Sequence, residues 1–114
     1  MEGVEILYTM EEGYRPQVQF EAWRVAILRY ADRFDRNSLT RLERHHLTDE
    51  VFVLLEGEAT LIIGDNCKEC FMEMNKIYNV KKDVWHHIIV SRDARVLIVE
   101  NDNTGLDNTE YLPL

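Results

Sequence analysis

The 114-residue chain has little cysteine, glycine or proline and no long hydrophobic run. Its two cysteines, Cys67 and Cys70, form a single Cys-x-x-Cys pair, with no further pair to complete a zinc site and no βαβ pattern typical of a redox motif. We interpret them as reduced thiols near a turn; a metal shared between subunits and a redox role stay open.

No segment approaches the roughly 20 apolar residues of a membrane span, and no basic-then-apolar leader is visible. These absences predict a cytoplasmic protein with no membrane partner.

Positive charge is also scarce, because 13 lysines and arginines face 21 acidic residues for a net charge of -8. A negative field repels phosphates, so nucleic acid and anionic membranes are excluded as expected partners. A small-molecule ligand is not excluded, since a pocket can differ from the surface around it. The hydrophobic content of 46% argues against disorder, and the length fits one domain over residues 1–114.

Short apolar or alternating segments separated by turn residues dominate the sequence. We predict strands over 4–9, 22–30, 39–46, 50–55, 59–63, 69–73, 77–80, 84–90 and 94–100. The stretch 11–17 is expected to turn the chain, and 31–38 to form a loop or a short helical turn. No stretch keeps a 3.6-residue period, so helix is a minor component. The pattern predicts an all-β sandwich or barrel.

Several of these segments are apolar on both faces. In 50–55, Phe52 and Leu54 share one face, whereas Val51, Val53 and Leu55 share the other. A sheet with one wet face would alternate apolar and polar residues, so both faces are expected to be covered. A second sheet would cover the inside, and either the terminal strands or a second subunit the outside. We favour a homodimer, because two-fold pairs are the commonest closed assembly.

The four histidines occur as two adjacent pairs, His45-His46 and His86-His87, each at or near a predicted strand. Neighbouring strand residues point to opposite faces. One histidine of each pair can therefore face the interior, which would bring two imidazoles from distant parts of the chain into one cavity.

The residues around these pairs resemble the two cupin motifs. Residues 45–57, HHLTDEVFVLLEG, resemble the first motif, with His45, Glu50 and Gly57 at matching positions. Residues 81–86, KKDVWH, are similar to the second, which ends at His86. The resemblance covers roughly 39–100. It implies a double-stranded β-helix, that is, a jelly-roll barrel of the small single-domain cupin type.

The sequence departs from both motifs. Glu43 stands where the first motif has its first histidine, and Lys81, Asp83 and Val90 replace the proline, glycine and asparagine of the second. Aspartate tolerates left-handed backbone better than most residues, so the turn at Asp83 can survive.

The resemblance implies a divalent metal held by His45, Glu50 and His86, with Glu43 as fourth ligand or general base. His46 is the alternative to His45, with only three residues between it and Glu50. Imidazole with carboxylate suits zinc, iron, nickel or manganese. The alternative interpretation is a cupin pocket that has lost its metal.

Other residues are candidates for lining the pocket. Trp23 and Trp85 could stack on a ligand or belong to the core. Arg41 could bind an anionic group, as could Arg24 or Arg44; alternatively, these arginines could lie on a charged surface of the protein. A hydroxyl donor could come from one of three tyrosines, namely Tyr14, Tyr30 and Tyr78.

Two functions follow from this pattern. The first is a metal-dependent enzyme acting on a small polar metabolite, with the reaction left open. The second is a non-catalytic cupin that binds a small molecule without metal. No glycine-rich phosphate loop or nucleophile elbow is present, so a covalent nucleophile is unsupported.

Overall fold

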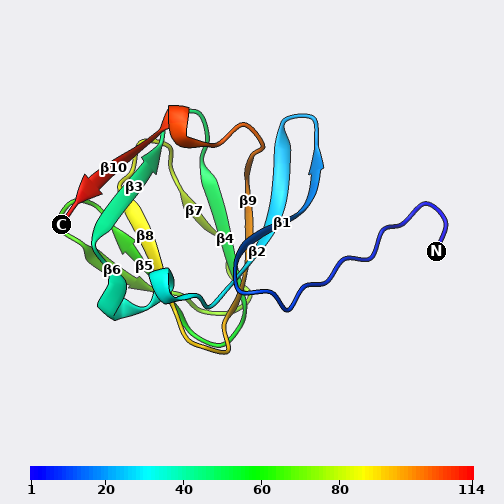
Figure 1. The fold of residues 1–114 in the computed structure, drawn as a ribbon, viewed down its shortest axis with the longest axis horizontal. Helices are drawn as coiled ribbons and strands as arrows, with labels where there is room; N and C mark the ends of the chain where they lie inside the picture. The colour runs from blue at the N-terminus through cyan, green and yellow to red at the C-terminus, as the bar shows by residue number, and fades with distance from the viewer.

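Two five-stranded antiparallel sheets form the fold (Figure 1). The computed structural model describes residues 1–114. The first sheet has the strand order β1-β2-β9-β4-β7, and the second sheet has the order β10-β3-β8-β5-β6. The strands are β1 (Gly13–Phe20), β2 (Trp23–Arg29), β3 (Arg41–His45), β4 (Glu50–Glu56), β5 (Ala59–Ile63), β6 (Lys68–Phe71), β7 (Tyr78–Val80), β8 (His86–Val90), β9 (Arg95–Asn101) and β10 (Thr109–Pro113). The predicted all-β architecture is confirmed.

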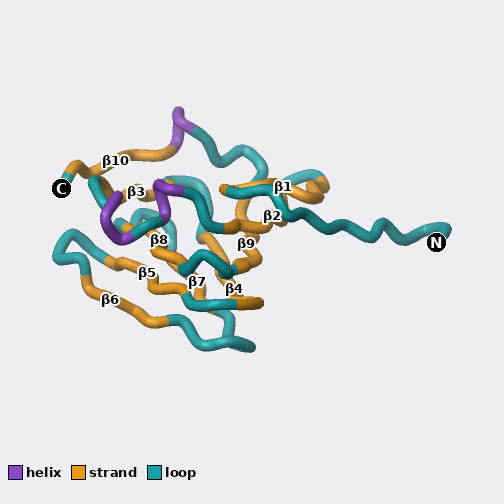
Figure 2. Tube along the Cα trace, turned by 60° about the horizontal axis from the view of Figure 1, so that its bottom comes forward, coloured by secondary structure: helices purple, strands orange, loops and turns teal.

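Helix is confined to three single 3₁₀ turns (Figure 2). Two of them, η1 (Asp32–Phe34) and η2 (Arg36–Ser38), lie in the connection from β2 to β3, where a loop or short helical turn was predicted. The third, η3 (Leu106–Asn108), precedes β10. No helix of this structure is long and apolar enough to cross a membrane.

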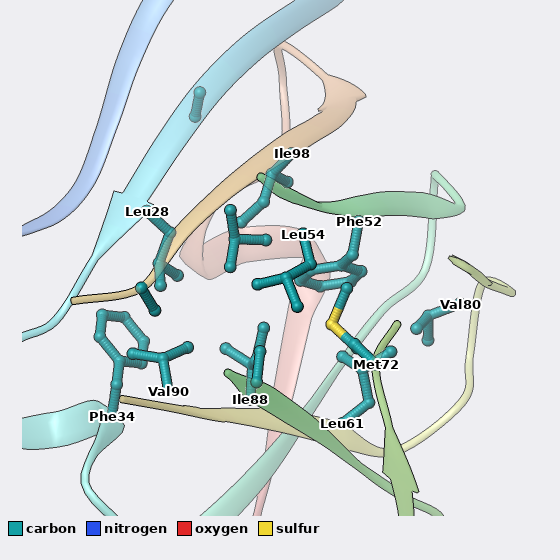
Figure 3. Close-up of a cluster of buried hydrophobic side chains, with 14 residues drawn as sticks. Leu28, Phe34, Phe52, Leu54, Leu61, Met72, Val80, Ile88, Val90 and Ile98 are labelled. Carbon is teal, nitrogen blue, oxygen red and sulfur yellow. The ribbon is translucent and has the colours of Figure 1, made fainter. Parts of the chain in front are cut away.

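The main core lies between the two sheets (Figure 3). Alternate residues of each strand point inward, as expected for packed sheets. From one sheet come Phe52 and Leu54 of β4 and Ile98 of β9; opposite them lie Leu61 of β5 and Ile88 of β8. Each such side chain contributes about 1.5–3 kcal/mol by leaving water. This rigid core fixes which residues of β3, β4, β8 and β9 face the cavity.

The first strand does not lie where the sequence pattern placed it. Residues 4–9 are not in a strand, and β1 instead covers Gly13–Phe20, most of which was expected to turn. Pro16 misled the prediction: it lies in an edge strand beside an irregularity in register between Pro16 and Val18, where a missing N–H is tolerated. Alternation alone predicted 4–9, but a strand also needs a partner.

The last strand, β10, was missed. It pairs with β3, with Thr109 opposite His45 and Leu112 opposite Leu42. Because β10 lies at the edge of the second sheet, it does not cover the outer face of the first sheet. The remaining predicted strands agree with the structure to within a few residues.

The outer face of the first sheet carries two rows of apolar side chains across β2, β9 and β4. One row aligns Val25, Val99 and Val51, and the other aligns Ile27, Leu97 and Val53. These side chains are only half-buried in the single chain. The predicted cover on this face is therefore not supplied by the terminal strand.

Both cysteines are free and half-buried. Cys67 lies in the turn between β5 and β6 with φ of 55°, and Cys70 lies within β6. Asp83 adopts the left-handed conformation with φ of 67°, so the expected turn before β8 is confirmed.

Gly57 provides a test of this packing. It has φ of +75°, and a Cβ at this position would lie 2.7 Å from the Ala94 Cα. Gly13 has a similar φ of +87° but nothing within 4 Å of such a Cβ. We expect Gly57→Ala to lower the free energy of unfolding by about 3 kcal/mol, from backbone strain plus overpacking. The matched variant Gly13→Ala should lose about 1 kcal/mol, from strain alone. Urea unfolding measures both, and equal losses would contradict the packing at Gly57.

Candidate metal centre

Three buried polar residues meet at one end of the cavity between the sheets. His45 ends β3, Glu50 begins β4 and His86 begins β8. The Glu50 Oε1 atom lies 3.1 Å from His45 Nε2 and 3.0 Å from His86 Nε2. The two imidazole ring centroids are 5.2 Å apart. Residues from distant parts of the chain thus converge on a single carboxylate oxygen.

The outer nitrogens of both rings have partners of their own. His86 Nδ1 lies 3.0 Å from the carbonyl oxygen of Val84, and His45 Nδ1 lies 2.9 Å from the hydroxyl of Thr109. A carbonyl only accepts, so His86 Nδ1 carries a proton and donates it. In the neutral ring, Nε2 then presents a lone pair to the Glu50 carboxylate. Two lone pairs at 3.0 Å require a cation between them, either a proton or a metal ion.

The pKa values of these groups reflect the competition between burial and pairing. Burial favours the neutral imidazoles, but hydrogen bonds and charge from Glu50 outweigh it, so the pKa values of His45 and His86 are raised. Burial likewise opposes charge on Glu50, yet hydrogen bonds from both histidines hold the pKa of its carboxyl well below the usual range. Glu50 is therefore an anion paired with positive charge.

The donor set fits a first-row divalent ion. Ligands bonded to one ion at about 2.1 Å and at right angles lie about 3 Å apart, which matches the Nε2–Oε1 spacings here. Metal-bound histidines commonly donate their other N–H to a carbonyl, as His86 does. Glu43 lies two residues before His45 on the same face of β3, and its Oε1 is 3.9 Å from His45 Nε2.

A second polar cluster faces this centre from the first sheet. Glu100 of β9 is buried; its Oε2 accepts hydrogen bonds from the Tyr14 hydroxyl and from Arg24. Its Oε1 has no hydrogen-bond partner, and Glu100, His45 and Glu50 offer ligand atoms within 4.8 Å of one another. Burial raises the pKa of the Glu100 carboxyl, and the nearby Glu50 charge raises it further. Glu100 can therefore hold or release a proton beside the centre.

The cavity has a volume of about 310 Å³, which is within the usual range for small-ligand sites. Among the predicted residues, those that line it are Arg24, Arg41, Glu43, His45, Glu50, His86 and Tyr14. Its lining also includes Phe52, Ile88 and Ile98, so its inner wall is the edge of the apolar core.

Several other predicted residues lie elsewhere. His46 is outside, with Nδ1 2.6 Å from Asp83 Oδ1 and Nε2 2.7 Å from Glu110 Oε1. Neither tryptophan lines the cavity: Trp23 is exposed near Phe20, and Trp85 lies beneath the guanidinium of Arg44.

The remaining tyrosine candidates also lack access to the cavity. Tyr30 donates its hydroxyl to Asp35, and the Tyr78 hydroxyl accepts from the Glu73 backbone N–H. Both therefore serve local turns.

Glu100, Thr109 and Arg33 at this site were not anticipated. Glu100 had a usable signal, because it is a charged residue that continues the inward-facing series of Val96 and Ile98. Thr109 and Arg33 had none, since their positions depend on how β10 and η1 pack.

Comparison of this fold with solved structures finds cupins. A cupin-2 domain protein from Shewanella frigidimarina is 17% identical with a TM-score of 0.61, over 82% of this chain and 84% of that one. An RmlC-like cupin family protein from Methanocaldococcus jannaschii is 14% identical with a TM-score of 0.62, over 89% and 92%. HppE, solved as an Fe(II) form with substrate, is 20% identical with a TM-score of 0.62, over 84% of this chain but 56% of that one.

No family model and no curated protein matches the sequence. The structural likeness nevertheless shows that this chain has the double-stranded β-helix fold of the small cupins, as the two sequence motifs predicted.

The pairing of Glu50 with two histidines predicts a pH-dependent contribution to stability in metal-free protein. Because the histidine pKa values are raised above the unfolded value of 6.5, this contribution is present below pH 6.5 and is lost as pH rises through the folded values. We expect Glu50→Gln to lower the free energy of unfolding by about 2 kcal/mol at pH 6 and by much less at pH 9. Urea unfolding at both pH values measures this, and a loss that does not change with pH would contradict the ion pair.

Proposed function

We propose that this protein binds one divalent transition-metal ion through His45, Glu50 and His86 and acts on a small polar metabolite in the adjoining cavity. The observation that supports the proposal most is the pair of Nε2 atoms facing one buried carboxylate oxygen at 3.0 and 3.1 Å. The Nδ1 partner of His86 orients its Nε2 lone pair toward that point. Zinc, iron, nickel and manganese all accept such ligands.

When bound, the ion would polarise a ligand oxygen or lower the pKa of a bound water. The chain's own residues supply the rest. The buried Glu100 can exchange a proton at its free Oε1, and the Tyr14 hydroxyl with Arg24 orients that carboxyl. Glu43, partly exposed at the cavity side of β3, is a fourth ligand or a base. The apolar wall formed by Phe52, Ile88 and Ile98 limits the entry of water.

The solved structures of HppE with Fe(II) and with Co(II), each in complex with substrate, give this proposal a precedent on the same fold. Fold similarity alone does not transfer a reaction.

A non-catalytic cupin is the second candidate. Protons on His45 and His86 satisfy the Glu50 carboxylate without any metal. In that case the same cavity would bind its ligand directly, and neither metal uptake nor turnover would be observed.

The two neighbouring histidines of β3 provide a matched test. His45 faces the cavity, whereas His46 faces outward. We expect wild-type protein stripped of metal to take up about one Co²⁺ or Zn²⁺ per chain. His45→Ala should weaken the metal affinity at least 100-fold, because losing a ligand costs more than losing a hydrogen-bond partner of a ligand, which typically lowers the affinity 10–100-fold. His46→Ala should bind as the wild type does.

Calorimetry and the visible spectrum of the Co²⁺ form measure this uptake. Metal affinity should fall as pH is lowered, because protons compete for the same Nε2 atoms. Wild-type protein that takes up less than a tenth of an ion per chain would refute the metal centre and favour the non-catalytic candidate.

We also propose that two copies associate through the outer face of the first sheet. The two half-buried apolar rows on β2, β9 and β4 form its centre, and the exposed Trp23 and Phe20 extend it. The N-terminal segment projects from the body (Figure 1), and Ile6 and Tyr8 on it are 84% and 70% exposed. A second copy offers the same apolar surface, which makes a self-complementary two-fold contact possible.

Val53 lies within this face and tests the association. Sedimentation should give a mass near twice 13.5 kDa for the wild type. We expect Val53→Asp to be a folded monomer at micromolar concentration, since a buried unpaired carboxylate disfavours an apolar interface. Lys68→Asp introduces the same side chain at an exposed position on the other sheet and should remain dimeric. A monomeric wild type would contradict the proposal.

A further inference from the structure

Two arginines at the mouth of the cavity have no acceptor. Arg33 of η1 and Arg41 of β3 both line the cavity and are exposed. Neither guanidinium makes a hydrogen bond or an ion pair. Arg33 instead lies 4.5 Å above the Phe34 ring, and Arg41 lies 3.9 Å above the Tyr111 ring. Stacking fixes a guanidinium in place while leaving its N–H edges free to donate.

Acidic residues outnumber lysines and arginines by 21 to 13, yet Arg33 and Arg41 have no carboxylate partner. Most other arginines have a carboxylate partner; these are Arg15, Arg24, Arg36, Arg44 and Arg95. The cavity mouth is thus a place where positive charge is not compensated. The exposed hydroxyl residues Ser38 and Thr40 line the cavity beside it.

The position of Arg41 relates the mouth to the metal centre. Arg41, Glu43 and His45 alternate along β3, so all three point to the cavity side. At about 3.3 Å per residue, the backbone of Arg41 lies about 13 Å from that of His45. The guanidinium of Arg41 stacks on Tyr111, which pairs with Glu43, two residues nearer to His45, so one small molecule can reach both ends.

We propose that Arg33 and Arg41 form an oxyanion clamp, and that the ligand is a small metabolite with a carboxylate or phosphate group at the end remote from His45, Glu50 and His86. Arginine donates two parallel hydrogen bonds to either group, which supplies both charge and orientation. The clamp rests on the proposed function for its role in substrate choice. Its anion-binding capacity does not depend on the metal.

The closing experiment uses full-length protein stripped of metal and desalted, at low ionic strength, where the clamp is least screened. Inorganic phosphate and glutarate are titrated separately, and the arginine Nε–H resonances are followed by ¹⁵N NMR. We expect the signals of Arg33 and Arg41 to shift with a dissociation constant in the millimolar range for at least one probe. The better probe identifies phosphate or carboxylate as the preferred group.

Variants separate the clamp from general charge. Arg33→Ala with Arg41→Ala should weaken binding at least tenfold, and the double lysine variant should weaken it less, because lysine keeps the charge but loses the paired donors. Arg92→Ala is the matched control, since Arg92 also stacks on a ring, 4.7 Å from that of Tyr30, but does not line the cavity. It should bind as the wild type does.

The clamp would be overturned if neither probe shifts Arg33 and Arg41, or if the double alanine variant binds both probes as tightly as the wild type. His45→Ala, which lacks the proposed metal centre, should still bind the probe. Wild-type protein that takes up no metal but still binds the probe would refute the proposed function while leaving the clamp intact.

Discussion

The buried contact between the Glu50 carboxylate and the Nε2 atoms of His45 and His86 is the interaction on which the site depends. Three polar groups at least nine-tenths buried are costly unless each has a partner. Here the cost is offset by shared protons, by cationic histidines or by a metal ion, because Glu50 and His86 need a proton or a metal ion between them. The fold therefore preserves a place that suits positive charge.

The sandwich makes this arrangement possible because it holds strands from distant parts of the chain in fixed register. Glu43 pairs with His86 across β3 and β8, and Thr109 pairs with His45 across β10 and β3. The packed core between the sheets prevents the side chains from spreading apart. On the opposite sheet, Arg24 lies opposite Glu100 across β2 and β9, and this pair forms the other wall of the cavity.

The electrostatics of the site differ from those of the whole molecule. The chain carries a net charge of -8, whereas its cavity combines the carboxylates of Glu43, Glu50 and Glu100 with two histidines of raised pKa and with two stacked arginines at the mouth. The acidic surface argues against polyanions such as nucleic acid, whereas the local charge suits a small anion that can enter the cavity. Net charge and pocket charge thus bear on different partners.

Local patterns were sufficient for most of the strands, because alternation depends on neighbouring residues. They left His45 and His46 as alternatives, and the structure places His45 toward the cavity. The same patterns failed at residues 4–9 and at β10, where the outcome depends on whether another strand is available to pair. They also predicted that Trp23 and Trp85 would either stack on a ligand or join the core, whereas the fold places both away from the cavity.

The sequence by itself determined the fold class and the pair of motifs, since strand periodicity and turn residues are properties of short segments. Only the tertiary structure decided that Glu100, Tyr14 and Arg24 face the histidines and that Arg33 and Arg41 share one cavity mouth. The physical reason is that these contacts join residues up to 86 positions apart. Their meeting is fixed by strand order and core packing, which no local pattern encodes.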